Sequence, residues 1–162
     1  MTIYLAGPDV FAPDASERLR KKKEYLCREV TGVTVLTPFD LEPPMMETKQ
    51  EIAYIIRRNN VAFVASCDVI VANLNPFRGD EPDSGTVYEV AYGTALGKTV
   101  IGYMDAFAMT QRERLGEKDA KGWEVEDFGL PLNLMFYGDN FTLCQDFESV
   151  VAYIKTLHVK EK

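Results

Sequence analysis

Four short apolar runs alternate with segments of helical spacing, and this alternation constrains the fold more than any other feature of the chain. The runs cover residues 3–6, 33–37, 68–74 and 99–103. The segments between them place apolar residues three and four positions apart, which is the spacing of a helix with one buried face. Strands that alternate with helices form a parallel sheet whose right-handed crossovers place helices on both faces.

The remaining elements complete this pattern. The predicted helices cover residues 15–29, 49–65 and 147–157, and residues 141–144 add a fifth strand. No repeat, low-complexity tract or linker divides the chain. We therefore expect an α/β fold with an open parallel five-stranded sheet, in a single domain that spans residues 1–162.

The composition narrows the class of partner. The chain has 162 residues, of which 46% are hydrophobic, and its net charge is −7. A nucleic-acid surface needs Lys and Arg to neutralise phosphates, so the acidic balance argues against nucleic acid, and it also argues against a membrane surface. No stretch approaches the roughly 18 apolar residues of a spanning helix, and residues 1–6 lack the features of a signal peptide. We expect a cytoplasmic protein that binds a small neutral or weakly charged partner.

Neither a metal nor a cofactor is predicted. The three cysteines, Cys27, Cys67 and Cys144, are widely spaced, and the chain has one histidine, so a zinc site is not expected. The loop at residues 7–11 precedes a helix, as a phosphate loop does, but it carries Asp9 and no Lys or Arg. It matches neither G-x-x-x-x-G-K nor G-x-G-x-x-G, which argues against a dinucleotide or a nucleoside triphosphate.

Glu89 is the only charged residue between Asp83 and Lys98. We expect a helix here, capped by Asp83, in which Gly85 and Gly93 leave open space beside the carboxylate. Burying an ionised carboxylate is costly, so a buried Glu89 is either paired or used. Spacing alone leaves open a second interpretation, in which Glu89 lies on a solvated stripe.

A carboxylate in a partly apolar pocket can attack an electrophilic sugar carbon and form a covalent glycosyl ester. Such a reaction needs no metal or cofactor. A tyrosine hydroxyl can hold the carboxylate in position, and Tyr4 in the first strand is the natural candidate.

Three segments carry a family resemblance. Residues 2–8 (TIYLAGP), 67–74 (CDVIVANL) and 83–93 (DSGTVYEVAYG) resemble the nucleoside 2-deoxyribosyltransferase family, and residues 131–135 (PLNLM) resemble that family's segment donated to a neighbouring subunit. The resemblance covers nearly the whole chain. It implies a flavodoxin-like fold, transfer of 2-deoxyribose between the nucleobases of 2'-deoxynucleosides, and a homodimer or higher homo-oligomer.

The resemblance also implies roles for individual residues. Glu89 is the expected nucleophile, Tyr4 its contact, and Asp68 an acid near the base and the leaving group. Asn133 and Met135 are expected to act in the neighbouring site. The remaining expected substrate contacts are Gly7, Phe11, Asp83, Ser84 and Gly85.

The chain departs from the family pattern in places, and alternatives remain open. Some members end in a tyrosine whose terminal carboxylate reaches the active site, whereas this chain ends in Lys162. Residues 111–127 are expected to form an exposed loop or a short helix, and Asp40 is a weak candidate for holding the base. The alternatives to transfer are hydrolysis of a 2'-deoxynucleoside 5'-monophosphate and a non-catalytic nucleoside-binding module.

Overall fold

Five parallel strands form one open sheet in the order β2-β1-β3-β4-β5. The computed structural model describes residues 1–41 and 48–160. The strands are β1 (Thr2–Ala6), β2 (Thr34–Leu36), β3 (Val69–Asn73), β4 (Thr99–Tyr103) and β5 (Phe141–Cys144). The chain adds β2 on one side of β1 and then β3, β4 and β5 on the other side, so the strand order reverses between β1 and β3. This topology confirms the predicted flavodoxin-like α/β fold. In such sheets the crevice for a ligand lies beyond the carboxyl ends of the strands at this reversal.

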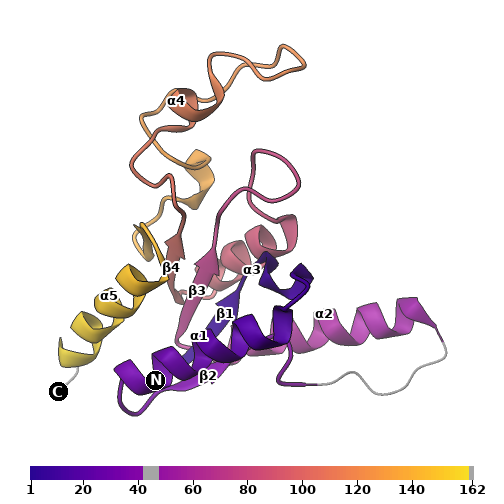
Figure 1. Cartoon of the computed structure of the whole chain (residues 1–162), viewed down its shortest axis with the longest axis vertical. Coiled ribbons are helices and arrows are strands. Elements are labelled where there is room, and N and C mark those ends of the chain that lie inside the picture. The colour runs from indigo at the N-terminus through magenta and orange to yellow at the C-terminus, as the bar shows by residue number, and fades with distance from the viewer. Residues whose placement is uncertain (42–47, 161–162) are drawn as a thin grey trace.

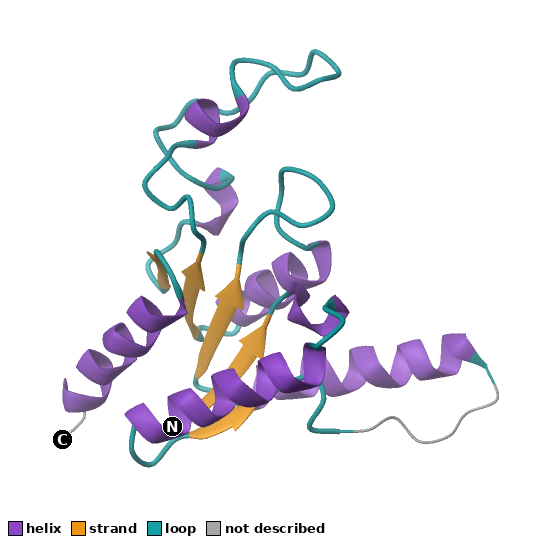
Figure 2. Ribbon diagram, in the orientation of Figure 1, coloured by secondary structure: helices purple, strands orange, loops and turns teal. Residues whose placement is uncertain are grey.

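Helices cover both faces of the sheet (Figures 1 and 2). The α-helices are α1 (Ala15–Glu29), α2 (Lys49–Ser66), α3 (Ser84–Ala95), α4 (Gln111–Leu115) and α5 (Phe147–Lys160), and two short 3-10 turns are η1 (Pro8–Phe11) and η2 (Leu134–Phe136). Among the described residues, none of the helices combines the length and the apolar character that crossing a membrane requires.

The alternation of side chains along β1 divides the core into two. Ile3 and Leu5 pack with residues of α1 and α5, whereas Tyr4 and Ala6 pack with residues of α2 and α3. Successive residues of a strand point to opposite faces, so a single strand contributes to both layers. Tyr4 therefore faces the layer that contains α3.

Glycine allows α3 to lie close to the sheet. A Cβ atom on Gly93 would lie 2.0 Å from Cδ1 of Ile70 in β3, which is far inside van der Waals contact. The helix begins at the Asp83 cap, whose Oδ2 accepts a hydrogen bond of 2.9 Å from the backbone N–H of Thr86. The cap fixes the start of α3 at the carboxyl edge of the sheet, and Gly93 fixes its depth.

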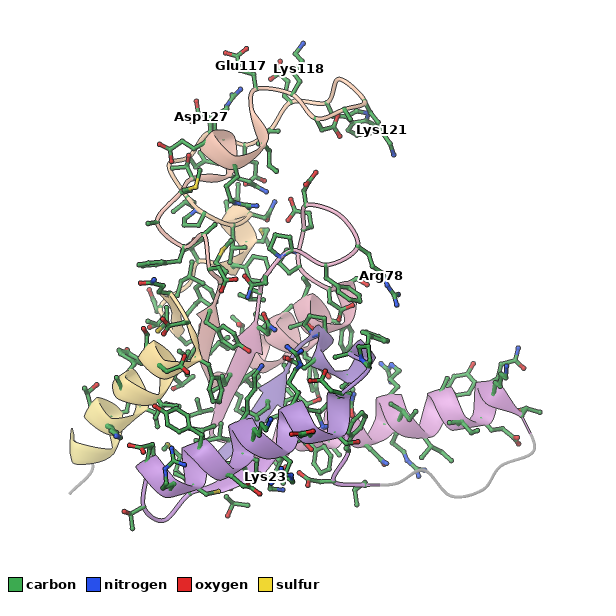
Figure 3. All side chains as sticks on the ribbon, viewed as in Figure 1. Lys23, Arg78, Glu117, Lys118, Lys121 and Asp127 are labelled. Carbon is green, nitrogen blue, oxygen red and sulfur yellow. The ribbon has the colours of Figure 1, made fainter. Side chains whose placement is uncertain are left out.

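Residues 104–133 depart from the sheet edge and form a projecting segment, which includes α4 (Figure 1). Beyond α4, the backbones of Lys118 and Glu124 form an isolated antiparallel β-bridge. Figure 3 shows the charged side chains of Glu117, Lys118 and Lys121 pointing outward from this segment. Residues 111–127 were expected to form an exposed loop or a short helix, and they form a short helix (α4) followed by a loop.

Candidate active site

The hydroxyl of Tyr4 donates a hydrogen bond of 2.8 Å to Oε1 of Glu89. Tyr4 lies in the middle of β1 and is fully buried, while Glu89 lies in the middle of α3 and is partly buried. The structure therefore selects the buried interpretation of Glu89 over the solvated stripe, and it places Tyr4 against the carboxylate as expected.

Burial raises the pKa of Glu89 from its ordinary value of 4.5 to about 7. The hydrogen bond from Tyr4 lowers this pKa, the negative charge of Asp83 raises it, and the nearby amide of Asn60 lowers it. Desolvation is the largest of these effects because water is the best solvent for the ionised form. Near neutral pH, Glu89 consequently exists in both its ionised and its protonated form.

A cavity of about 690 Å³ opens over Glu89, and we call it the main cavity. It reaches from the loop after β1 to the first turns of α3, at the carboxyl edge of the sheet. It is lined by Gly7, Val10, Phe11, Ser16, Pro38, Phe39, Leu41, Ile56, Asn60, Asp83, Gly85, Thr86 and Glu89. Within the described part of the chain, Asp83 and Glu89 are the only charged residues of this lining, and most of the rest is apolar or aromatic. A planar, uncharged ligand with a few polar groups suits such a cavity.

Asp83 and Gly85 shape the floor of the main cavity beside Glu89. Oδ2 of Asp83 accepts from both the N–H and the hydroxyl of Thr86, at 2.9 and 3.0 Å. Among the residues that the structure describes, none donates a hydrogen bond to Oδ1 of Asp83, so this oxygen can accept from a ligand. Ser84 is exposed at the first position of α3 and does not line the cavity.

Gly7 and Phe11 lie in the wall formed by the loop after β1. Gly7 has a positive φ of 156°, and a Cβ atom there would lie 2.8 Å from Cβ of Asn73, so glycine is needed at this position. The ring of Phe11 is 54% exposed and stacks on Phe77 with ring centroids 5.3 Å apart. An exposed aromatic ring at the mouth of a cavity offers a face on which a nucleobase can stack.

Asn60 of α2 was missed by the sequence analysis. It lines the main cavity beside Glu89, and its side chain lowers the pKa of that carboxyl. Its Oδ1 is buried and has no hydrogen-bond partner among the described residues. An unpaired buried acceptor is costly, and a bound donor would relieve it. In sequence, Asn60 is inconspicuous because it follows two arginines and another asparagine in a mixed polar helix.

The structure contradicts the expected position of Asp68. This residue precedes β3, at the amino end of the strand, whereas the cavity lies at the carboxyl end. Its side chain is exposed, and Oδ2 accepts a hydrogen bond of 2.7 Å from the N–H of Thr2. Asp68 therefore joins two strands and does not lie where a base would depart.

Asp40 does not line the main cavity either. Its Oδ2 accepts from the N–H of Thr37 at 2.6 Å, and its Oδ1 accepts from Lys23 at 2.7 Å. Its neighbours Phe39 and Leu41 form the cavity wall in its place. The loop that contains Asp40 thus contributes to the cavity wall, but the Asp40 side chain contacts Lys23 and the backbone of Thr37 instead.

Asn133 and Met135 lie at a second, smaller cavity on a different side of α3, with Val87, Val90 and Phe136. Asn133 caps η2, because its Oδ1 accepts from the N–H of Met135 at 3.0 Å, and its Nδ2 donates to Glu126. Met135 is 83% exposed. Neither residue lines the main cavity of its own chain, so a role in catalysis requires a second copy.

Glu89 is also reached from a groove between α2 and α3. This α2–α3 groove has a volume of about 440 Å³ and includes Ala53, Arg57, Val61 and Tyr88. It shares Ile56, Asn60, Gly85 and Glu89 with the main cavity. Among the residues that the structure describes, no three His, Cys, Asp or Glu side chains gather as a metal site requires.

An open parallel sheet with a tyrosine-held carboxylate under a largely apolar cavity defines a small α/β protein that is equipped for carboxylate chemistry on an organic ligand. The chain belongs to the nucleoside 2-deoxyribosyltransferase family, whose model matches residues 3–135. Membership of this family indicates a deoxyribosyltransferase-like enzyme.

Similar proteins support the assignment. The structure of a 2-deoxyribosyltransferase from Leishmania mexicana shares 36% identity and a TM-score of 0.82 with this chain, and the match covers 97% of this chain and 98% of that one. The enzyme from Bacillus psychrosaccharolyticus is 22% identical with a TM-score of 0.63 over 97% of this chain and 96% of its own, which supports the fold alone.

A curated relative adds sequence similarity without a known activity. An uncharacterised protein of Schizosaccharomyces pombe is 34% identical over an alignment of 128 positions, which covers 74% of this chain. The match spans 58% of that relative's length.

Proposed function

We propose that this protein transfers 2-deoxyribose between the nucleobases of 2'-deoxynucleosides through a covalent ester on Glu89. The single observation that carries this proposal is the Tyr4–Glu89 pair, a buried carboxylate held by a hydroxyl at 2.8 Å on the floor of the main cavity. Family membership supplies the substrate class.

The proposed reaction has two displacements at one carbon. An oxygen of ionised Glu89 attacks the anomeric carbon as the bond from this carbon to the base nitrogen breaks, and the base takes up a proton from water. A second base then attacks the same carbon, breaks the ester and gives up its proton. Two inversions restore the original configuration, as in retaining glycosidases.

The lining of the main cavity supports a division of labour between its residues. The free Oδ1 of Asp83 can accept a hydrogen bond from a sugar hydroxyl, and the exposed ring of Phe11 can stack on the base. The buried Oδ1 of Asn60 can accept from a donor of the sugar or the base. Among the described residues that line the cavity, Asp83 is the only acid besides Glu89, and the proposal assigns proton delivery to the base to water.

A mechanism-based trap tests the proposal. A 2-fluoro-arabinosyl nucleoside slows hydrolysis of the ester, so the adduct should accumulate and be found on the Glu89 peptide by mass spectrometry. Glu89→Ala should form no adduct and should lose base exchange by orders of magnitude. Glu17→Gln, on the exposed surface of α1, is the matched control and should react as the wild type does. Binding without base release or adduct would identify a non-catalytic module and overturn the proposal.

A second candidate function is hydrolysis of 2'-deoxynucleoside 5'-monophosphates. The guanidinium of Arg78 supports it, because it lies 4.9 Å from the centroid of the Phe11 ring at the cavity mouth, on the loop before α3 (Figure 3). A cation there can contact a phosphate. Incubation with a deoxynucleoside plus a second base, and separately with a deoxynucleotide, separates the two functions. Exchange in the first mixture supports transfer, and base release only in the second supports the hydrolase.

A further inference from the structure

A buried ion pair lies behind the cavity wall formed by the loop after β1. Asp9 is flanked in sequence by wall residues, but its own side chain is only 6% exposed and contacts α1 and β3 instead. Nζ of Lys22 lies 2.9 Å from Oδ2 of Asp9 and donates to the hydroxyl of Tyr103 at 2.7 Å. The same ammonium lies over the rings of Tyr103 and Phe147, 5.3 and 5.4 Å from their centroids.

Asn73 extends this network along the carboxyl edge of the sheet. Its Nδ2 donates to Oδ2 of Asp9 at 3.1 Å, and its Oδ1 accepts from the backbone and the side chain of Asn75 at 3.2 and 3.0 Å. Oδ1 of Asn75 accepts in turn from the N–H of Asp105 at 2.9 Å. The network therefore connects the loops that follow β1, β3 and β4.

The network lies on the opposite face of the sheet from the nucleophile. Tyr103 and Phe147 belong to the core that contains α1 and α5, whereas Tyr4 belongs to the core that contains α2 and α3. No hydrogen bond among the described residues connects Lys22 or Asp9 to Tyr4 or Glu89. A change in the network can therefore move the cavity wall without moving the nucleophile.

We propose that Lys22 and Asn73 are positioning residues that act through Asp9 to hold the wall residues Gly7, Val10 and Phe11 against the substrate. Without the Lys22 ammonium, Oδ1 of the Asp9 carboxylate keeps a longer contact of 4.0 Å with Nε of Arg18, whose side chain is 48% exposed. The carboxylate is then drawn toward Arg18 and water, and it takes the short η1 turn with it. The wall then opens, while the Tyr4–Glu89 pair stays in place. The kinetic part of this inference rests on the proposed transfer reaction.

Kinetics of Lys22→Met test the inference, because Met retains the apolar stem and removes the charge. We expect KM for the deoxynucleoside to rise about tenfold, the effect of losing one charge-assisted hydrogen bond, while kcat changes by less than about twofold. A purely structural role would reduce the folded fraction, which lowers kcat at an unchanged KM. Lys21→Met is the matched control, because Lys21 is the preceding residue and pairs with Glu17 on the surface.

Removal of both charges provides a rescue. In the double variant Lys22→Met with Asp9→Asn, the neutral amide needs no cation, so KM should return to within about threefold of the wild type. An unchanged KM in Lys22→Met, or equal KM values in the single and double variants, would overturn the inference. Where Lys22→Met fails to fold, Asn73→Ser removes the neutral donor to Asp9 together with the acceptor for Asn75, without removing a charge, and KM should rise about threefold.

Hydrogen exchange tests the positioning independently of activity. Amides of residues 9–12 should exchange at least about tenfold faster in Lys22→Met than in the wild type, and near the wild-type rate in the double variant. Equal exchange in Lys22→Met and the wild type would overturn the positioning role. A wild-type protein without transfer activity would instead overturn the proposed function, and the exchange data would still decide the role of Lys22.

Discussion

Tyr4 and Glu89 are 85 positions apart in sequence and are joined by one hydrogen bond of 2.8 Å, which connects the sheet to the middle of α3. This bond opposes the effect of burial on the carboxylate, because a hydroxyl donor stabilises the ionised form. The balance leaves the pKa of Glu89 at about 7. The carboxylate is thereby available as a nucleophile near neutral pH although little water solvates it.

Tyr4→Phe should move the pH dependence of transfer. Only ionised Glu89 attacks, so kcat/KM of the wild type should fall as the pH drops below about 7. Loss of the donor raises the pKa of Glu89 further, so the acidic limb should shift to higher pH and the rate at pH 7 should fall about tenfold. Tyr25→Phe, on the other face of the sheet, is the control. An identical pH profile in Tyr4→Phe would contradict this role.

Glu89→Gln should become more stable than the wild type as the pH rises. The pKa of Glu89 in the folded chain lies above its ordinary value of 4.5, so folding favours the protonated form. The wild type therefore loses stability as the pH rises from about 4.5 through about 7, and the amide does not. Urea denaturation at pH 5 and pH 8 measures the difference, which should grow with pH.

The control for this measurement is Glu17→Gln. Lys21 lowers the pKa of exposed Glu17, so this carboxylate is ionised in both the folded and the unfolded chain at pH 5 and at pH 8. Its small effect on stability should be the same at the two pH values. A Glu89→Gln difference that does not change between them would argue against the raised pKa.

Asn60→Ala should lower kcat/KM, whereas Asp68→Asn should leave it almost unchanged. Asn60 contacts Glu89 and presents an unpaired acceptor to the main cavity, so its loss should lower kcat/KM about tenfold or more. Asp68 contacts the N–H of Thr2 outside the cavity, so Asp68→Asn should retain kcat/KM within about threefold. Steady-state kinetics of the two purified variants measure these effects. A larger loss of kcat/KM in Asp68→Asn than in Asn60→Ala would indicate that Asp68 takes part in the reaction.

Mixing two inactive variants tests the expected exchange of residues between subunits. If Asn133 acts in the neighbouring site, Glu89→Ala and Asn133→Ala chains should each be inactive alone. Refolded together in equal amounts, they should recover about a quarter of the wild-type activity, because half of randomly formed dimers contain one intact site of two. Continued inactivity of the mixture, with mixed dimers present by native mass spectrometry, would contradict the exchange of Asn133 between subunits. Activity of Asn133→Ala alone would show that Asn133 is not needed in either site.

Gly93→Ala should destabilise the fold by about 1–3 kcal/mol, as overpacking of a well-packed core does. Its new methyl group would overlap Cδ1 of Ile70 and push α3 away from β3. Gly138→Ala is the matched control, because the nearest atom to its added Cβ is 3.6 Å away. Thermal denaturation of both variants measures the difference, and equal midpoints would show that α3 accommodates the methyl group without cost.

The strands and the central pair were accessible from sequence for simple physical reasons. Runs such as residues 69–72 are apolar throughout, which is typical of a strand buried on both faces. The first and third strands are neighbours in the inferred sheet, and their loops meet at one edge, so Tyr4 and Glu89 were correctly brought together. The face of the sheet on which Tyr4 lies follows from the alternation of side chains along β1.

Asp68, Asp40 and Asn60 show where such reasoning fails. The acid at residue 68 was assigned by resemblance alone, although its place before a parallel strand puts it at the edge opposite the ligand crevice. Asp40 and Phe39 are adjacent, and only the path of the loop decides which faces the cavity. Asn60 needs the packing of α2 on α3 to become visible, and no local pattern encodes this packing.

Glu89 forms part of the walls of both the main cavity and the α2–α3 groove. This double access has a consequence for inhibitor chemistry. A compound that mimics the nucleoside occupies only the main cavity, whereas a substituent that passes Glu89 beside Gly85 would enter the groove and meet Arg57 and Tyr88. An acidic substituent at that position would reach the cation of Arg57, whereas no Lys or Arg is among the described residues that line the main cavity. The groove residues would then determine how selectively such a compound binds among related enzymes.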